Sequence, residues 1–290
     1  MAELTLLQTE NLSMPSRSQA ASGLQRIMSG LSIAVLAATL LFNAVLAWVN
    51  AHITILSPAI VSACQGMIVI SALLLGGYQK GEVAVRWLAL AWLLVMAVFL
   101  TSALRAQMEP KILGDILLIP AFILLGTRMD GKHLRQTIFF LQGLVTIVGI
   151  WELARPDQFG ALFNVLDYYV QTRGYDAKAF WAGGELFLSS ERPGGRLLLD
   201  GFGLHRGSSL FLEPVSLGNW TIVATLFTAT MWYELSRLAK AAMAASILVL
   251  LIVCDGRLAL SVVLMLCAYM PLCRWLPDRL SILYLPGLLM

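Results

Sequence analysis

Long apolar runs, separated by short polar segments, dominate the chain from residue 27 onward. Eight of these runs hold about 15–24 mostly apolar residues, close to the length that a helix needs to cross the hydrocarbon core of a bilayer. We therefore predict an all-α protein, a polytopic transmembrane helix bundle of about eight spans and a partial ninth. The predicted spans are residues 27–49, 53–76, 83–104, 112–126, 137–153, 215–235, 239–253 and 258–272.

The spans divide the chain into four predicted regions. Residues 1–26 are polar and form a cytoplasmic N-terminal tail rather than a cleavable signal peptide. Residues 27–154 hold helices one to five, residues 155–212 form one large loop, and residues 213–290 hold helices six to eight. A further apolar run from Ile282 to Met290 is too short to cross the bilayer as a helix. We expect a truncated chain, because no polar residue follows this run; the alternative is a half-inserted tail.

Composition and charge agree with a membrane protein. Hydrophobic residues make up 59% of the chain and charged residues 13%, and the mean hydropathy is +0.79. A soluble domain carries about 25% charged residues, so this chain has too little polar surface for a water-facing globule. The net charge of +3 is spread along the sequence, which gives no basic patch for nucleic acid.

The distribution of Lys and Arg predicts the orientation of the bundle. If the N-terminus is cytoplasmic, cytoplasmic segments hold eleven basic residues and the short outer loops hold three, a clear positive-inside bias. The loop 155–212 then lies outside, in the periplasm of a bacterium. The cytoplasmic set is Arg17, Arg26, Lys80, Arg86, Arg128, Lys132, Arg135, Arg237, Lys240, Arg274 and Arg279; the outer set is Arg105, Lys111 and Arg257.

The first part of the large loop has helical periodicity. Between residues 158 and 171, apolar side chains recur at helical spacing on one face, with polar side chains mostly on the other. One interpretation is a helix lying in the outer membrane interface, with its aromatic rings at the depth of the lipid headgroups. The other is a helix packed on the bundle. The apolar positions are Phe159, Leu162, Phe163, Leu166, Tyr169 and Val170.

The second part of the loop, residues 183–207, is rich in glycine and arginine. Glycine lets backbone amides approach an anion, and the arginine guanidinium matches phosphate oxygens. Arg192, Arg196, Arg206 and His205 therefore favour a phosphate-bearing or acidic glycan ligand at the outer interface. A solvated linker with incidental arginines is the alternative.

The loop ends in the sequence RGSSLFLEP at residues 206–214, directly before a predicted span. Pro214 suits the first position of a helix, which places Glu213 at the N-cap. Helix N-termini bind anions, and the eighth predicted span also begins at the outer side, after Asp255 and Arg257. Together the two termini would frame one site, in which a carboxylate accepts a proton from an attacking hydroxyl. The alternative is a capping role for Glu213 and an interface-anchoring role for Arg257.

Other polar features of the sequence carry less chemistry. The cysteines lie in or at the ends of apolar runs and lack C-x-x-C spacing, as expected for small buried hydrophobic side chains. Few ionisable groups lie near the middle of a span, which disfavours an ion-coupled transporter. Glu152, with Arg155, marks the outer end of the fifth span.

At residues 206–214 and 255–257 the sequence resembles the O-antigen ligase/polymerase superfamily, and within it the Wzy-type exopolysaccharide polymerases. The arginine-x₁₀-glycine pattern of the family's loop is matched by Arg192 with Gly203 and by Arg196 with Gly207. The hydrophobic layout extends the resemblance over most of the chain. The sequence departs from the family in length, because such enzymes normally continue through several more spans.

The resemblance implies a metal-independent, cofactor-free glycosyltransferase of the bacterial inner membrane. It would polymerise oligosaccharide repeat units into an exopolysaccharide, using a donor linked to undecaprenyl pyrophosphate, at the periplasmic face. Chain-length regulators and export proteins would be partners. In this scheme Arg206 and Arg257 stabilise the pyrophosphate, Glu213 or His205 deprotonates the acceptor, and three further residues bind substrate. Those three are Arg192, Arg196 and Asp255.

Two rival functions remain open at this point. A ligase of the same superfamily would transfer the finished glycan to a lipid or protein acceptor. A non-catalytic membrane component or flippase of a polysaccharide export system would have no transfer activity, and alanine at Arg206, Glu213 and Arg257 would leave polymer length unchanged.

Overall fold

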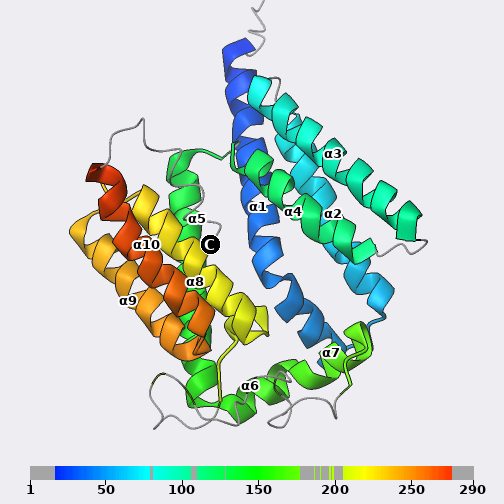
Figure 1. Cartoon of the computed structure of the whole chain (residues 1–290), viewed down its shortest axis with the longest axis vertical. Coiled ribbons are helices and arrows are strands. Elements are labelled where there is room, and N and C mark those ends of the chain that lie inside the picture. Colours follow the sequence, from blue (N-terminus) through cyan, green and yellow to red (C-terminus); the bar gives the residue numbers. More distant parts are fainter. Residues whose placement is uncertain are drawn as a thin grey trace, which may run out of the picture. The chain divides into compact units, whose positions relative to one another are not determined.

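The computed structural model describes residues 17–78, 81–105, 110–127, 129–176 and 205–275, together with positions 186, 190, 196 and 198 (Figure 1). In this part of the chain the regular elements are helices. They are α1 (Arg17–His52), α2 (Pro58–Gly77), α3 (Glu82–Arg105), α4 (Pro110–Gly126), α5 (Gly131–Ala154), α6 (Pro156–Phe163), α7 (Val165–Arg173), the 3-10 helix η2 (Ser209–Phe211), α8 (Pro214–Thr230), α9 (Arg237–Cys254) and α10 (Arg257–Trp275).

The all-α prediction is confirmed, and each of the eight predicted spans contains a helix. Within the described residues, five helical segments are long and apolar enough to cross a membrane, as in a membrane protein. They are Ile27–His52, Pro58–Gly77, Ala84–Leu104, Gly131–Ala154 and Arg237–Cys254. The total of eight spans, the partial ninth and the orientation of the bundle stay predictions.

Two predicted spans extend beyond their helices. The second span was expected from residue 53, but α2 begins at Pro58, because the Asn50 side chain accepts the Leu56 N–H at 2.8 Å and closes a turn before the helix. The sixth was expected to reach residue 235, but α8 ends at Thr230. Residues 231–234 form turns that reverse the chain, and the Ser236 side chain then caps α9.

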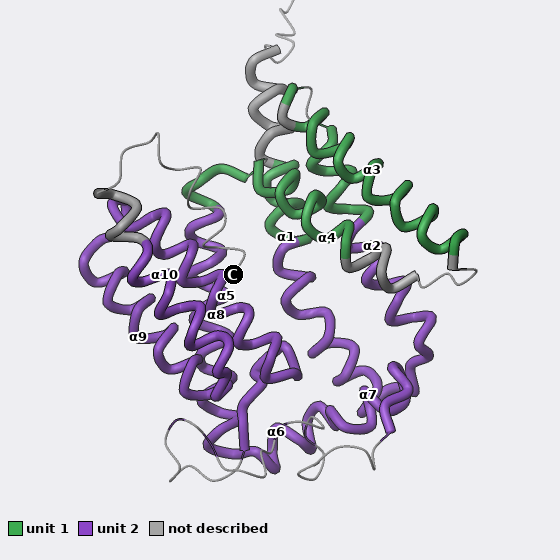
Figure 2. The backbone as a smooth tube through the Cα atoms, viewed as in Figure 1, with its two compact units in different colours: residues 1–35, 70–133 green, residues 36–69, 134–290 purple. Residues whose placement is uncertain are grey.

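The chain divides into two compact units, residues 1–35 with 70–133 and residues 36–69 with 134–290 (Figure 2). Both α1 and α2 contribute to each unit. In the first unit α3 packs along α4, and α2 approaches α4 closely at Gly76. A Cβ atom placed on Gly76 would lie 2.5 Å from Cβ of Leu124, so only glycine fits this contact.

In the second unit α8 packs against both α9 and α10 (Figure 1). The core of this unit also includes α5, the second half of α1, and α6 and α7. A buried polar contact links three of the helices: Gln142 of α5 donates to Ser246 of α9 at 2.9 Å and accepts from the Trp220 indole of α8 at 2.7 Å.

The predicted helix 158–171 is two helices. Asn164 adopts a left-handed conformation with φ 40° and separates α6 from α7, which is tolerated best by Asn, Asp and Gly. Because the break rotates α7 relative to α6, Val165 and Tyr168 join Phe159 and Tyr169 in the core.

The aromatic side chains of this segment are packed on the bundle. Phe159, Tyr168 and Tyr169 are at most 1% exposed. The Tyr168 hydroxyl donates to Asn43 of α1 at 3.3 Å, and His52 of α1 bonds the Leu162 carbonyl at 2.9 Å. The packed-helix interpretation therefore describes α6 and α7, and their depth in a membrane stays a prediction.

Candidate functional site

The C-terminal end of α9 is the point where the large loop returns to the bundle. The last carbonyls of a helix have no partner inside the helix. Here the Gly207 N–H donates to the Val253 carbonyl at 2.8 Å, and Nε of Arg206 donates to the Cys254 carbonyl at 3.1 Å. A guanidinium N–H of Arg196 donates to the Ile252 carbonyl. Three successive carbonyls of α9 are thus bonded by the loop.

Arg196 is bonded on all sides and is 3% exposed. Besides its bond to α9, Nη1 donates to the His205 carbonyl at 2.6 Å and Nε donates to the Leu198 carbonyl at 3.3 Å. Burial lowers the pKa of Arg196, and the nearby Asp255 carboxylate acts in the opposite direction. The side chain holds the loop together and places a positive charge at the negative end of the α9 dipole.

Arg206 and Asp255 belong to the same cluster. Arg206 is 8% exposed, and its backbone N–H donates to the Ser190 carbonyl at 2.6 Å. Asp255 follows α9 in a left-handed conformation, is fully buried, and accepts the Leu198 N–H at 2.7 Å. Arg196, Arg206 and Asp255, predicted to contact substrate, therefore connect the loop to α9.

Glu152 is a central residue of this site whose role the sequence did not reveal. Its side chain, on the last turns of α5, is 1% exposed and accepts three hydrogen bonds from the loop. The donors are the Ser208 N–H at 2.7 Å, the Ser208 hydroxyl at 2.9 Å and the Ser209 N–H at 2.5 Å. The available signal was a carboxylate at the end of an otherwise apolar span, since such groups are rarely incidental.

His205 lies beside Glu152 on the inner side of the loop. Its Nε2 is 3.4 Å from Oε1 of Glu152, which makes an ion pair when the imidazole is protonated. Both ring nitrogens are buried and have no hydrogen-bond partner. The imidazole therefore faces the carboxylate rather than the surface.

Gly207 occupies a position that admits no side chain. A Cβ atom there would lie 2.4 Å from Cγ1 of Val253 and 3.3 Å from Oε2 of Glu152. The glycine therefore permits its own N–H to reach the Val253 carbonyl while the neighbouring serines reach Glu152. This is the reason that the sequence needs glycine between Arg206 and Ser208.

The segment between Gly207 and α8 is conformationally strained. Ser209 and Leu212 have φ values of 51° and 60°, and a left-handed conformation costs a branched residue such as leucine about 1–3 kcal/mol. Buried contacts hold both residues in place: the Ser209 hydroxyl donates to the Val145 carbonyl at 2.7 Å, and Leu212 is fully buried. This path directs Glu213 to the start of α8.

Glu213 is the N-cap of α8 and Pro214 is its first residue, as predicted. The Glu213 carboxylate is half-buried and makes no side-chain capping bond; instead it accepts the Ser216 hydroxyl at 2.9 Å. It also lies close enough to Tyr169 of α7 to contribute, with burial as the larger cause, to a raised pKa of that phenol. The carboxylate is thus held at the first turn of α8 by Ser216.

The helices α8 and α10 approach each other closely near their N-terminal ends. A Cβ atom on Gly218 of α8 would lie 3.1 Å from Cβ of Ala259 of α10. Arg257, the first residue of α10, is exposed. Two helix N-termini thus lie together at one end of the second unit, and one of them carries an exposed guanidinium. Such ends bind anions through free N–H groups and the helix dipole.

The predicted site residues fall into two groups. Arg196, His205, Arg206 and Asp255 face inward around Glu152 and the end of α9, whereas Glu213 and Arg257 stand at the N-termini of α8 and α10 and are half-buried and exposed. Arg192 lies outside the described residues. In the described part of the chain, no three His, Cys, Asp or Glu side chains gather as a metal site.

This end of the second unit combines a carboxylate, a guanidinium and two helix N-termini, which suits proton transfer beside a bound anion. The chain matches no protein-family model, no curated protein and no solved structure.

Proposed function

We propose that the protein is an inner-membrane polysaccharide polymerase that transfers a glycan from undecaprenyl pyrophosphate to a growing chain at the periplasmic face. The observation that carries the proposal is the adjacency of the α8 and α10 N-termini, with Glu213 at the N-cap of α8 and Arg257 as the first residue of α10. The resemblance at residues 206–214 and 255–257 falls at the same place.

In the proposed reaction the bond between the donor's anomeric carbon and the pyrophosphate oxygen breaks, and the leaving pyrophosphate keeps the electron pair. The acceptor hydroxyl forms the new glycosidic bond and gives its proton to Glu213. Arg257 and the helix N-termini stabilise the charge that develops on the pyrophosphate. The half-buried Glu213 carboxylate and the exposed Arg257 guanidinium support these roles.

Arg196 and Arg206 have a different role in this proposal. Both guanidinium groups already donate to α9 carbonyls and both are buried. They act as positioning residues, which fix the loop on α9 and thereby set the strained path to Glu213. Glu152 does the same from α5 through Ser208 and Ser209.

The test uses purified full-length protein in lipid vesicles with a lipid-linked repeat unit, and polymer length is read on gels. Glu213→Gln should lower the rate of chain extension by about 100-fold or more, the usual contribution of a general base. Arg257→Ala should lower it by about 100-fold. Matched controls are Glu82→Gln and Arg86→Ala, an exposed ion pair on α3, which should leave the rate unchanged.

Folding is checked in each variant by thermal unfolding in detergent. Full polymer length with both Glu213→Gln and Arg257→Ala would overturn the proposed roles and favour a non-catalytic export component. Labelling of a lipid or protein acceptor, without extension of the glycan, would identify a ligase instead.

A further inference from the structure

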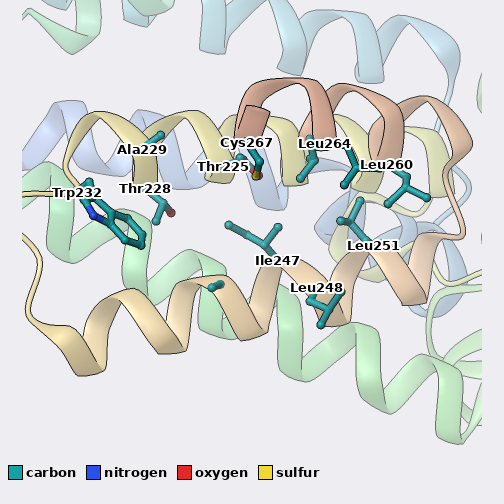
Figure 3. A pocket seen from close by; sticks show the side chains of 12 residues that line it. Thr225, Thr228, Ala229, Trp232, Ile247, Leu248, Leu251, Leu260, Leu264 and Cys267 are labelled. Atoms are coloured by element: carbon teal, nitrogen blue, oxygen red, sulfur yellow. The ribbon is translucent and has the colours of Figure 1, made fainter. Parts of the chain in front are cut away.

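A cavity of about 530 Å³ lies between α8, α9 and α10 (Figure 3). It is lined by the C-terminal end of α8 from Thr225 to Ala229, by Trp232 in the turn after α8, by the middle of α9 from Ala244 to Leu251, and by α10 from Leu260 to Cys267. Its size is in the usual range of small-molecule sites, which often lie between the helices of a bundle.

The cavity opens sideways between α9 and α10. Its floor is buried, with Ile247, Leu251 and Val263 at 7% exposure or less, while Leu248 of α9 and Leu264 of α10 are each 59% exposed at its rim. Both helices pack on α8. They leave between them a groove that faces outward from the second unit, and we call this the α9–α10 groove.

The side chains that line the α9–α10 groove are mainly apolar. Its two threonines donate their hydroxyls to their own helix: Thr225 to the Thr221 carbonyl and Thr228 to the Ala224 carbonyl, each at 2.7 Å. The helix α9 is long and apolar enough to span a membrane, and in a membrane the medium that meets this opening would be lipid. An unfilled groove would lose the dispersion contacts of its walls, so an acyl chain is the matching occupant.

A basic end distinguishes this groove from an ordinary lipid-facing surface. Lys240 precedes Ala244 by one helical turn, so it continues the α9 stripe that lines the groove. Its Nζ lies 4.9 Å from the ring centroid of Trp232, which also lines the groove. Arg237 is one turn further back on the same face of α9.

An acidic residue that the structure describes at this end is already paired. Glu234, in the turn between α8 and α9, lies 3.5 Å from Arg135 of α5. Lys240 and Arg237 are not in the ion pairs of the described residues. Two cations therefore stand where a lipid headgroup would meet the groove.

We propose that the α9–α10 groove binds one anionic glycerophospholipid, with an acyl chain along Ile247, Leu251 and Val263 and the headgroup phosphate at Lys240 and Arg237. Basic pockets between membrane helices bind anionic headgroups in this way. The proposal depends on the membrane placement of α8–α10 and not on the proposed glycosyl transfer.

The experiment is native mass spectrometry of the full-length protein in detergent, titrated with phosphatidylglycerol or with phosphatidylcholine of the same acyl chains. Wild type should bind one phosphatidylglycerol more tightly than phosphatidylcholine. Lys240→Gln should weaken phosphatidylglycerol binding by about fivefold and leave phosphatidylcholine binding unchanged, as expected for the loss of one basic residue near a phosphate. Lys132→Gln, an exposed lysine at the start of α5, is the charge control.

A second pair of variants tests the groove itself. Ala244→Phe adds bulk at the groove and should abolish the bound-lipid mass, whereas Ala245→Phe, at an exposed α9 position outside the lining, should not. Equal binding of both lipids, or retention of lipid in Ala244→Phe, overturns the proposal. A dimer mass that Ala244→Phe removes also overturns it, because a second copy of the chain would then fill the groove. Failure here leaves the polymerisation assay unaffected, so the two proposals fail separately.

Discussion

Two close contacts at glycine, one in each unit, show different ways of holding helices together. In the first unit Gly76 of α2 meets Leu124 of α4, and the atoms around it are a side-chain carbon and the backbone of Leu124 and Leu125. In the second unit Gly207 meets Val253 and Glu152, and its N–H bonds the end of α9. The first contact is packing alone, and the second belongs to a buried hydrogen-bond network.

The difference shows which contacts fix one particular arrangement of the chain. Close packing of small residues is enough to join apolar helices, and side-chain hydroxyls of the first unit, such as those of Ser32 and Thr101, bond their own helix. A buried carboxylate and two buried guanidinium groups are costly unless their partners are complete. The second unit has such a cluster, and its geometry depends on Gly207, Ser208 and Ser209. Such an arrangement is expected where the position of a loop must be fixed.

The largest expected effect comes from the carboxylate of Glu152. Glu152→Ala leaves the Ser208 and Ser209 N–H groups buried without their acceptor, and each lost partner costs about 1–3 kcal/mol. We expect the free energy of unfolding to fall by about 4 kcal/mol, measured by denaturant unfolding in detergent micelles.

Glu152→Gln is the matched variant, because it keeps one acceptor oxygen in the same volume. It should lose about half as much stability as the alanine variant. If both variants unfold like wild type, the hydrogen bonds to the loop contribute nothing to the fold, and the contrast between the two units fails.

Arg196→Gln should have the next largest effect. It removes the guanidinium bonds to the carbonyls of Leu198, His205 and Ile252, and bonds from a charged donor contribute about 1.5–3 kcal/mol. We expect a loss of about 3 kcal/mol and faster limited proteolysis between residues 155 and 212. Arg196→Lys keeps the charge without the planar fork, so rescue by lysine would show that charge alone matters at the end of α9.

The two glycines provide a direct comparison of the units. Gly76→Ala and Gly207→Ala should each cost about 2 kcal/mol through overpacking. Only Gly207→Ala should also speed proteolysis of the loop. Under the proposed function it should slow chain extension as well, because of the two contacts only that one positions Glu213.

The controls for this pair are two glycines at which an added Cβ atom has no close neighbour. A Cβ atom on Gly66 of α2 or Gly143 of α5 meets nothing within 4 Å. Both alanine variants should be neutral or more stable by up to about 1 kcal/mol, from the higher helix propensity of alanine. Equal effects of Gly76→Ala and Gly207→Ala on chain extension would remove the distinction between packing and positioning.

The sequence predicted the helices well, because each span is a long apolar run and Pro214 marks the start of α8. It did not predict the network at the end of α9. The partners of Arg196 and Arg206 are backbone carbonyls of residues 252 and 254, and any residue type supplies a carbonyl, so no spacing encodes the pairing. Glycine and arginine in the loop looked like phosphate ligands because the same groups that bind an anion also cap a helix C-terminus.

For a related reason, the apolar periodicity from residue 158 to 171 did not decide between an interface helix and a helix packed on the bundle. An apolar face indicates burial, but not whether lipid or protein covers it. The break at Asn164 also carries no strong signal, because asparagine is common inside helical patterns as well as in left-handed positions. Only tertiary contacts with α1 place Phe159 and Tyr168 in the core.

The smallest expected effect lies at that contact and tests it by pH. Tyr168→Phe removes the hydroxyl that donates to Asn43 and should cost about 1 kcal/mol near neutral pH. Burial raises the pKa of Tyr168 to about 12 from its usual 10, so the folded protein keeps a proton that the unfolded chain releases. The contribution of Tyr168 to the stability of wild type should therefore be constant below pH 10 and fall as the pH rises toward 12. The phenylalanine variant should fall less steeply, although Tyr169 still contributes in both proteins, so the difference between them should shrink with pH. A constant difference from pH 9 to 12 would show that Tyr168 is not buried against α1.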